Sequence, residues 1–152
     1  MPHIVLLYAA LLALLFVGLS TRTLRLRRRL GIAIGDAGNE SMLRAMRVHS
    51  NFAEYVPLTL LMIYLVEVTG APPLWVHGLG ISVLLGRVSH AFGVSQTQEN
   101  YVFRVAGMAM TFTPLIVSAL RLLWVYAGEG VAWGQKWTAL EFAATEGLKS
   151  GL

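Results

Sequence analysis

Polar and ionisable side chains recur at helical spacing between residues 44 and 54. Arg44, Arg47, Asn51 and Glu54 lie at offsets of 0, 3, 7 and 10 residues, which places them on one narrow stripe of a helix. Arginine guanidinium groups bind carboxylates and phosphates through paired hydrogen bonds. The stripe is polar for about three turns and apolar beyond them, so it predicts a polar site near one end of the helix.

Two later segments carry similar side chains at a matching depth. Arg87 and His90 stand three residues apart, and Tyr101 stands three residues before Arg104. Counted at about 1.5 Å per residue from the turn at 70–73, Arg87 and His90 lie about 20 Å or more along their helix, level with the polar stripe. Arg104 and Tyr101 open the next helix at the same level. The sequence therefore predicts that three helices present polar groups to one layer.

The charges in this layer do not cancel. Three arginines, Arg47, Arg87 and Arg104, face one carboxylate, that of Glu54. Two positive charges are left over, and an anionic ligand would neutralise them. A structural alternative stays open, in which Glu54 pairs with Arg87 or Arg47 inside the protein. His90 has a similar alternative as a hydrogen-bonding group between helices.

The elements that must position these groups are membrane helices. Hydrophobic residues make up 56% of the chain and charged residues 13%, against roughly 25% charged in a typical soluble domain. Four apolar runs approach the ~20 residues that a helix needs to cross the hydrocarbon core. A soluble helical bundle is the main rival, but the first and last runs have no polar face to show water. We therefore predict an all-α integral membrane four-helix bundle in one domain, 1–152, with spans at about 3–21, 48–70, 74–94 and 102–127.

The distribution of arginine orients these spans. The loop 22–47 carries seven arginines, whereas the turn 70–73 carries none, and cytoplasmic loops are enriched in Lys and Arg. This asymmetry predicts that the loops 22–47 and 95–101 are cytoplasmic and that the N- and C-termini lie on the outer, periplasmic side. Topology and attraction to anionic headgroups explain most of the arginines at 22–29.

Charged and aromatic residues near the outer ends of the spans require less explanation. Glu67 and Arg121 lie near the outer ends of their helices. A long side chain there can extend its charged group to the membrane surface, so no chemical role is assigned to either residue. Trp133 and Trp137 lie at helical spacing in the segment 131–148, and Trp favours the bilayer interface. The tail is therefore expected to form an interfacial helix on the outer side.

Several function classes are disfavoured. The chain contains no Cys, so it can form no disulfide and supply no thiol nucleophile or Cys-ligated metal. No pair of histidines has the spacing of a metal-binding helix, and no metal is expected. The cations fall between apolar runs rather than along a soluble surface, so nucleic acid is not an expected partner.

Two stretches resemble a known family. The segment 39–57, with Arg47, Asn51, Glu54 and Pro57 at its core, resembles the MAPEG family of membrane-associated proteins in eicosanoid and glutathione metabolism. The segment Gly86-Arg87-Val-Ser-His90 is similar to the family's third-helix motif, and Arg104 resembles an arginine that contacts the glutathione thiolate. The resemblance covers roughly residues 5 to 125.

This resemblance implies a bacterial inner-membrane homotrimer that binds glutathione as a cosubstrate in a cytoplasm-facing cleft between neighbouring subunits. It further implies a glutathione transferase or glutathione-dependent peroxidase that acts on lipophilic electrophiles from the bilayer. Arg104 would be the catalytic residue that stabilises the thiolate. The residues expected to hold glutathione or line its pocket are Arg25, Arg47, Asn51, Glu54, Arg87, His90 and Tyr101.

Two other functions stay open. The family resemblance is also compatible with a non-enzymatic lipid-binding or scaffold trimer in the membrane. A small transporter is a third reading, but a transporter should carry polar residues through to the outer leaflet, and here they stop near the inner one.

Overall fold

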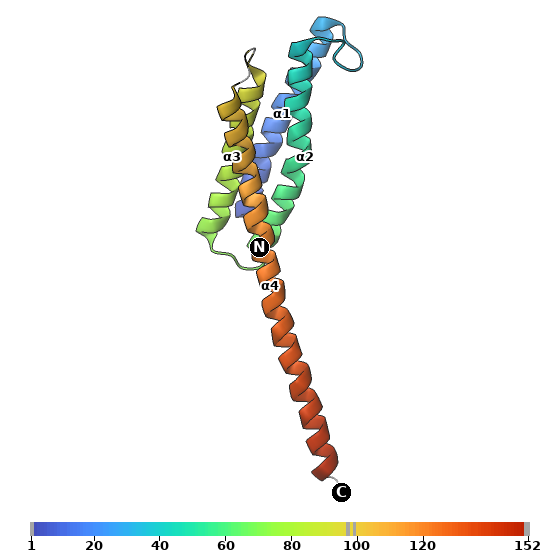
Figure 1. The fold of residues 1–152 in the computed structure, drawn as a ribbon, viewed down its shortest axis with the longest axis vertical. Coiled ribbons are helices and arrows are strands. Elements are labelled where there is room, and N and C mark those ends of the chain that lie inside the picture. The colour runs from blue at the N-terminus through green and yellow to red at the C-terminus, as the bar shows by residue number, and fades with distance from the viewer. Residues whose placement is uncertain (1, 97, 99, 151–152) are drawn as a thin grey trace. The chain divides into compact units, whose positions relative to one another are not determined.

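The computed structural model describes residues 2–96, 98 and 100–150, with the side chains of 129–150 outside that description. Four helices follow one another: α1 (Ile4–Leu30), α2 (Glu40–Val68), α3 (Pro73–Ser95) and α4 (Tyr101–Ser150). The described part of the chain contains no strand. The predicted all-α class is therefore confirmed (Figure 1).

The chain divides into two compact units, Met1–Ser118 and Ala119–Leu152. The first unit contains α1, α2, α3 and the beginning of α4, which together form the four-helix bundle. The predicted interfacial helix at 131–148 falls in the second unit. The backbone there is helical, but the side chains on which that prediction rests lie outside the described residues.

Local capping explains where α1 ends and α2 begins. Gly31 follows α1 in the left-handed conformation, with φ 68°, which a residue without Cβ adopts at little cost. Three arginines in the last turn of α1 complement the negative end of the helix dipole. At the start of α2 the Asn39 side chain accepts a hydrogen bond of 3.0 Å from the Met42 backbone N–H. The loop 31–39 therefore joins two capped helix ends.

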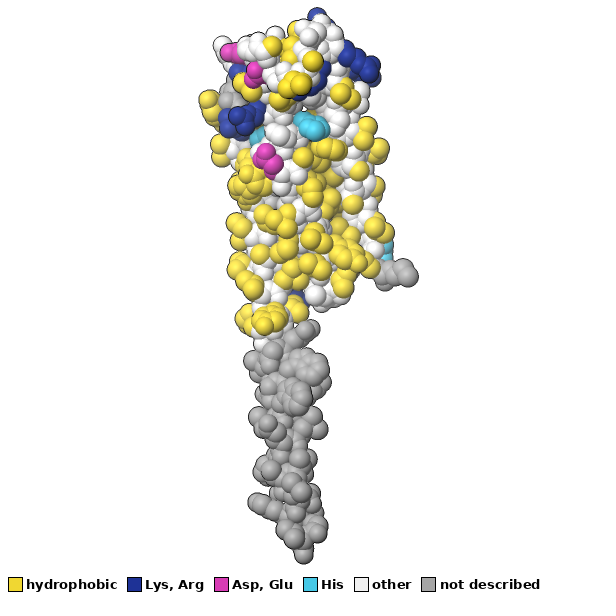
Figure 2. Space-filling model, turned by 90° about the vertical axis from the view of Figure 1, so that its right-hand side faces the viewer, with side chains coloured by type: hydrophobic (Ala, Val, Ile, Leu, Met, Phe, Trp, Pro, Cys, Tyr) yellow, Lys and Arg dark blue, Asp and Glu magenta, His cyan; other side chains and the backbone are white. Residues whose placement is uncertain are grey.

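The two ends of the bundle differ. The last turns of α1 and α3, the loop 31–39 and the first turns of α2 and α4 lie at one end, which we call the arginine-rich end. The loop 69–72 and the first turn of α1 lie at the other, which we call the turn end. Most charged side chains on the face drawn in Figure 2 lie towards one end, and hydrophobic side chains cover the surface beyond them.

Three helical segments are long and apolar enough to cross a membrane, among the residues described: α1, α2 and 101–128 of α4. The four-span prediction also includes α3, which is 23 residues or about 34 Å long. His77, Arg87 and His90 interrupt the apolar sequence of α3 along its length. Arg87 and His90 are buried inside the bundle, so their charge and polarity do not face lipid.

The bundle core follows the 3.6-residue period of each helix. Buried residues recur every three or four positions along α2: Met42, Ala45, Val48, Phe52, Val56, Thr59, Ile63 and Val66. This stripe packs against α1 and α3. The polar stripe of α2 occupies a different face of the same helix, so burial of the apolar stripe turns the polar one away from the core.

Close contact between α3 and α4 fixes the rotation of α3. A Cβ atom at Gly107 would lie 2.5 Å from the backbone nitrogen of His90, and one at Gly86 would lie 2.9 Å from the Gly107 carbonyl oxygen. Small residues allow helices in membranes to approach this closely. The contact thereby sets the direction in which Arg87 and His90 project from α3.

Candidate functional site

A cleft of about 580 Å³ opens at the arginine-rich end between α2, α3 and the first turn of α4. This volume lies within the range of roughly 300 to 1,000 Å³ typical of small-molecule sites. The lining residues are Glu40, Leu43, Arg44, Arg47, Ser50, Asn51, Glu54, His90, Val94 and Arg104. We call this cleft the polar cleft.

Helix α2 supplies seven of these residues, at intervals of one to three positions between Glu40 and Glu54. They share one face of the helix, because another face is buried in the core through residues such as Ala45 and Phe52. Arg47 and Glu54 are exposed in the single chain, and Asn51 is half-buried. The polar stripe predicted from the sequence is therefore the α2 wall of the cleft.

Arg87 lies behind that wall and not in the cleft. Its side chain is 2% exposed, and its Nη1 donates a hydrogen bond of 2.6 Å to the Asn51 Oδ1. Its Nη2 donates to the Gly107 carbonyl oxygen at 3.3 Å, while the buried Nε has no partner among the described residues. Arg87 thus fixes the Asn51 side chain from α3 and ties both to α4.

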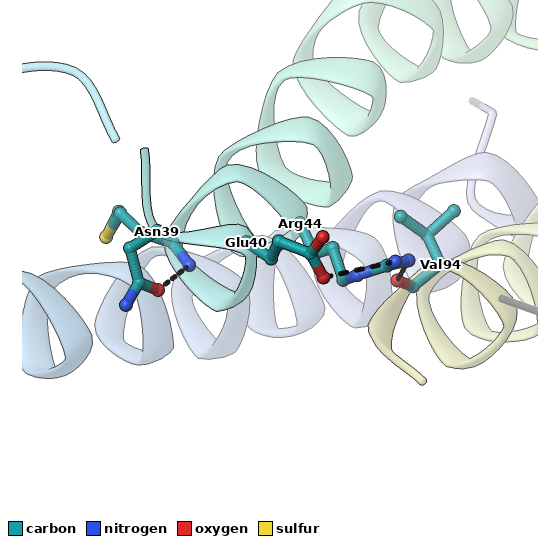
Figure 3. Close-up of polar contacts among 5 residues, drawn as sticks. Asn39, Glu40, Arg44 and Val94 are labelled. Carbon is teal, nitrogen blue, oxygen red and sulfur yellow. Dashed lines mark hydrogen bonds and ion pairs between the residues drawn. The ribbon is translucent and has the colours of Figure 1, made fainter. Parts of the chain in front are cut away.

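Arg44 is held in the cleft wall by groups from two helices (Figure 3). Its Nη2 lies 4.0 Å from the Glu40 Oε2, and its Nη1 donates to the Val94 carbonyl oxygen at 3.5 Å. These contacts direct the Arg44 guanidinium across the gap from α2 towards the end of α3. Arg44 was on the predicted stripe but not among the predicted site residues, although its spacing of three from Arg47 was the available signal.

The structure brings five of the eight predicted site residues to the polar cleft: Arg47, Asn51, Glu54, His90 and Arg104. Arg87 supports the cleft through Asn51. Tyr101 is 66% exposed and is not part of the lining. Arg25 lines a separate cleft beside α1. Four further residues complete the lining and were not predicted as site residues: Glu40, Leu43, Ser50 and Val94.

The cleft carries more cationic than anionic groups. Arg44, Arg47 and Arg104 face Glu40 and Glu54 across it. In the described part of the chain, Arg44 and Glu40 form an ion pair, whereas Glu54 forms neither an ion pair nor a hydrogen bond. The structural alternative that paired Glu54 with Arg87 or Arg47 is therefore not seen in the single chain. Nor do any three His, Asp or Glu side chains among the described residues lie close enough together to hold a metal ion.

Comparisons with known proteins place this architecture in a family. The MAPEG family model matches residues 5–124. The chain is also 36% identical over 118 residues to the inner membrane protein YecN of Escherichia coli K12, which covers 78% of this chain and 88% of the relative. The corresponding protein of Escherichia coli O6:H1 shows the same identity and coverage. Together with the three apolar helices, these relatives support an integral inner-membrane location. The chain belongs to the MAPEG family.

Proposed function

We propose that the protein binds glutathione in the polar cleft and joins it, through its sulfur, to a lipophilic electrophile that arrives from the bilayer. The observation that carries this proposal is the juxtaposition of three arginines and an uncommitted carboxylate, Glu54, in one cleft of a membrane-embedded bundle. Ionisable groups at membrane depth are costly and usually serve a function unless they pair with one another. The positive-inside rule would put this cleft on the cytoplasmic side.

The charges of the cleft match those of glutathione. The tripeptide carries two carboxylates, one ammonium group and a thiol that becomes an anion when it reacts. Three anionic groups would face Arg44, Arg47 and Arg104, and the ammonium group would face Glu54. Asn51, whose Oδ1 is occupied by Arg87, has its amide N–H donors available for a backbone carbonyl of the tripeptide. In this allocation each charge of the ligand meets an opposite one.

Arg104 is the candidate for thiol activation. A cation beside a thiol lowers the pKa of that thiol and raises the thiolate fraction at neutral pH. The thiolate would attack an electrophilic carbon with its electron pair, forming a C–S bond while the leaving group departs with the displaced pair. His90 lies in the same cleft and could hydrogen-bond the leaving group or the tripeptide. In a peroxidase reaction the same thiolate would attack one oxygen of an O–O bond and release the other as an alkoxide. The resulting glutathione sulfenic acid would react with a second glutathione to give the disulfide and water.

A homotrimer would complete this site. Arg25 lines a separate cleft beside α1 in its own chain, so one chain does not bring Arg25 to the polar cleft. A site between neighbouring subunits, which the family implies, would recruit Arg25 from the adjacent copy. The numerous exposed apolar side chains on α1 and α4, among them Leu14, Leu120 and Leu123, would then divide between lipid and subunit contacts.

Calorimetric titration with glutathione in detergent tests the proposal. Arg104→Ala and Glu54→Ala should each weaken binding by about tenfold or more, because a hydrogen bond to a charged group is worth about 1.5 to 3 kcal/mol. Arg28→Ala is the matched control, since Arg28 is exposed and lines neither cleft. Arg104→Ala should also raise the pKa of the bound thiol, as followed by ultraviolet thiolate absorbance. The proposal would be wrong if the protein did not bind glutathione, or if neither Arg104→Ala nor Glu54→Ala changed the affinity.

A non-enzymatic lipid-binding or scaffold trimer is the second candidate. The apolar groove between α1 and α2, lined by Leu12, Phe16, Phe52, Val56 and Leu60 among others, favours it because a lipid chain could lie there without any polar partner. Binding of a lipid chain in this groove, with no turnover of any electrophile in the presence of glutathione, would favour this candidate over the enzyme.

A further inference from the structure

A second cleft of about 410 Å³ lies at the arginine-rich end on the α1 side of α2. We call it the arginine cleft. It is formed by the last third of α1, the first turns of α2 and the end of α3. Its lining residues are Arg22, Arg25, Leu26, Arg29, Glu40, Ser41, Arg44 and Ser95. Four guanidinium groups therefore face one carboxylate, a larger excess of positive charge than in the polar cleft.

Two of the four arginines are positioned by the fold. The Arg22 Nη1 donates a hydrogen bond of 2.6 Å to the Ser95 Oγ across the gap from α1 to α3. Arg44 is held by the Val94 carbonyl oxygen and by Glu40. In the described part of the chain Arg25 and Arg29 have no hydrogen bond or ion pair. The arginine cleft thus combines two fixed cationic groups with two that are available to a ligand.

The remaining arginines of the same helix behave differently. Arg27 donates hydrogen bonds to the carbonyl oxygens of Ala33 and Gly35, at 3.4 and 3.0 Å, and so supports the loop 31–39. Arg28 is exposed and lines neither cleft. A general attraction to an anionic surface would use every arginine of the cluster equally. The structure instead gathers Arg22, Arg25 and Arg29 around one cavity and leaves Arg27 and Arg28 out of it.

We propose that the arginine cleft is a specific binding site for the headgroup of an anionic phospholipid. Arginine suits a phosphodiester because its planar fork donates paired hydrogen bonds to phosphate oxygens. Basic pockets between membrane helices at the charged boundary are general sites for such headgroups. Leu26 lines the same cavity, and Leu14 and Val17 are exposed further towards the middle of α1. The headgroup would lie among the arginines while its acyl chains extend along α1 towards these apolar side chains.

The lipid site can be tested separately from glutathione binding, although Arg25 belongs to both proposed sites. The two clefts share Glu40 and Arg44 as part of their walls, but Arg22 and Arg29 line the arginine cleft and not the polar one. Substitutions of Arg22 and Arg29 therefore test the lipid site. Arg25 and Arg44 are left unchanged in the test, because the proposed glutathione site uses both.

Native mass spectrometry of the delipidated full-length protein in detergent provides the measurement. The probes are phosphatidylglycerol, which is anionic, and phosphatidylethanolamine, which carries the same phosphodiester without net charge. Phosphatidylglycerol should bind with a discrete stoichiometry and about tenfold more tightly than phosphatidylethanolamine. Arg29→Gln and Arg22→Gln should each weaken phosphatidylglycerol binding about tenfold, whereas Arg28→Gln, which removes the same charge from the same helix, should change it less than about twofold.

Ser95→Ala tests whether the position of the Arg22 guanidinium matters in addition to its charge. It removes no charge but releases Arg22 from its hydrogen bond across the cleft. Binding of phosphatidylglycerol should fall about threefold if the fixed position of the guanidinium matters. Glutathione affinity of Ser95→Ala should equal that of the unmodified protein, since Ser95 does not line the polar cleft.

Three outcomes would overturn the lipid site. Equal weakening of about fivefold by Arg22→Gln, Arg28→Gln and Arg29→Gln would show diffuse electrostatic attraction instead. Inorganic phosphate at millimolar concentration binding with the same sensitivity to Arg29→Gln, in the absence of lipid binding, would assign the cleft to a soluble anion. Displacement of phosphatidylglycerol by glutathione, lost in Arg29→Gln, would show that the two clefts are one site.

Discussion

Two carboxylates on the same helix, Glu54 and Glu67, are 13 residues apart and have opposite surroundings. Glu67 lies at the turn end and accepts hydrogen bonds from the backbone N–H groups of His3, Ile4 and Val5, at 2.8, 2.9 and 2.8 Å. Glu54 lines the polar cleft and forms no ion pair or hydrogen bond with the described residues. One carboxylate is used by the fold, and the other is available to a ligand.

Other polar side chains at the two ends of the bundle show the same difference. At the turn end the Tyr8 hydroxyl and the His77 Nδ1 share a hydrogen bond of 2.9 Å, so another pair of polar groups is satisfied between α1 and α3. At the arginine-rich end, by contrast, Arg25 and Arg29 have no partner among the described residues. The arginine-rich end therefore differs from the turn end in keeping charged groups that the fold leaves unsatisfied, and these groups lie in the two proposed binding sites.

The largest loss of stability is expected when the buried Arg87 is replaced. Arg87→Ala should lower the free energy of unfolding by about 2 to 5 kcal/mol, because it leaves a cavity and frees the Asn51 side chain. Chemical unfolding in detergent measures this. Arg47→Ala is the control at the same end, since Arg47 is exposed and its loss leaves no buried cavity. Equal stability of the two variants would contradict a structural role for Arg87.

A smaller effect is expected at the turn end. Glu67→Ala removes the acceptor of three N–H groups at the start of α1, and loss of a helix cap typically costs about 0.5 to 2 kcal/mol. Thermal unfolding should show this loss, and amide hydrogen exchange should increase at Ile4 and Val5. Glutathione affinity should stay unchanged. If that affinity fell in parallel, the two ends would be coupled and the contrast between the two carboxylates would fail.

The smallest change in stability is expected for Glu54→Ala. The Glu54 side chain is exposed and forms no hydrogen bond or ion pair with the described residues, so the free energy of unfolding should change by less than about 0.5 kcal/mol. The same variant should bind glutathione about tenfold or more weakly. Glu67→Ala should show the opposite combination, with lower stability and unchanged glutathione affinity. Marked destabilisation by Glu54→Ala would assign that carboxylate to the fold as well.

Sequence periodicity was sufficient to predict the α2 wall of the cleft. Arg47, Asn51 and Glu54 share a face because helical spacing alone determines it, and the structure puts all three in the lining. The capped start of α2 could also be read from Asn39 and Glu40, although the predicted span begins at residue 48. Helix α1 likewise continues to Leu30, past the end of its predicted span at residue 21, because arginine is a good helix former and the helix need not end where its apolar run ends.

The positions of Arg25, Arg87 and Tyr101 relative to the cleft could not be predicted in the same way. Each depends on the rotation of its helix against a neighbour. For α3 that rotation is set by the close contact of Gly86 with Gly107, which involves two residues far apart in sequence. The role of Glu67 was missed for a similar reason. Snorkelling was a sufficient explanation within α2, and its actual partners are backbone groups of another helix.

The burial of Arg87 has a consequence for the synthesis of the protein. Taken alone, α3 would carry a guanidinium group into hydrocarbon at a cost of at least about 2.5 to 3.5 kcal/mol. The groups that shelter Arg87 come from Asn51 on α2, made earlier, and from Gly107 on α4, made later. Helix α3 therefore reaches its most favourable state in the bilayer only after the first turns of α4 have left the ribosome. Its insertion is tied to the order of translation as well as to its own composition.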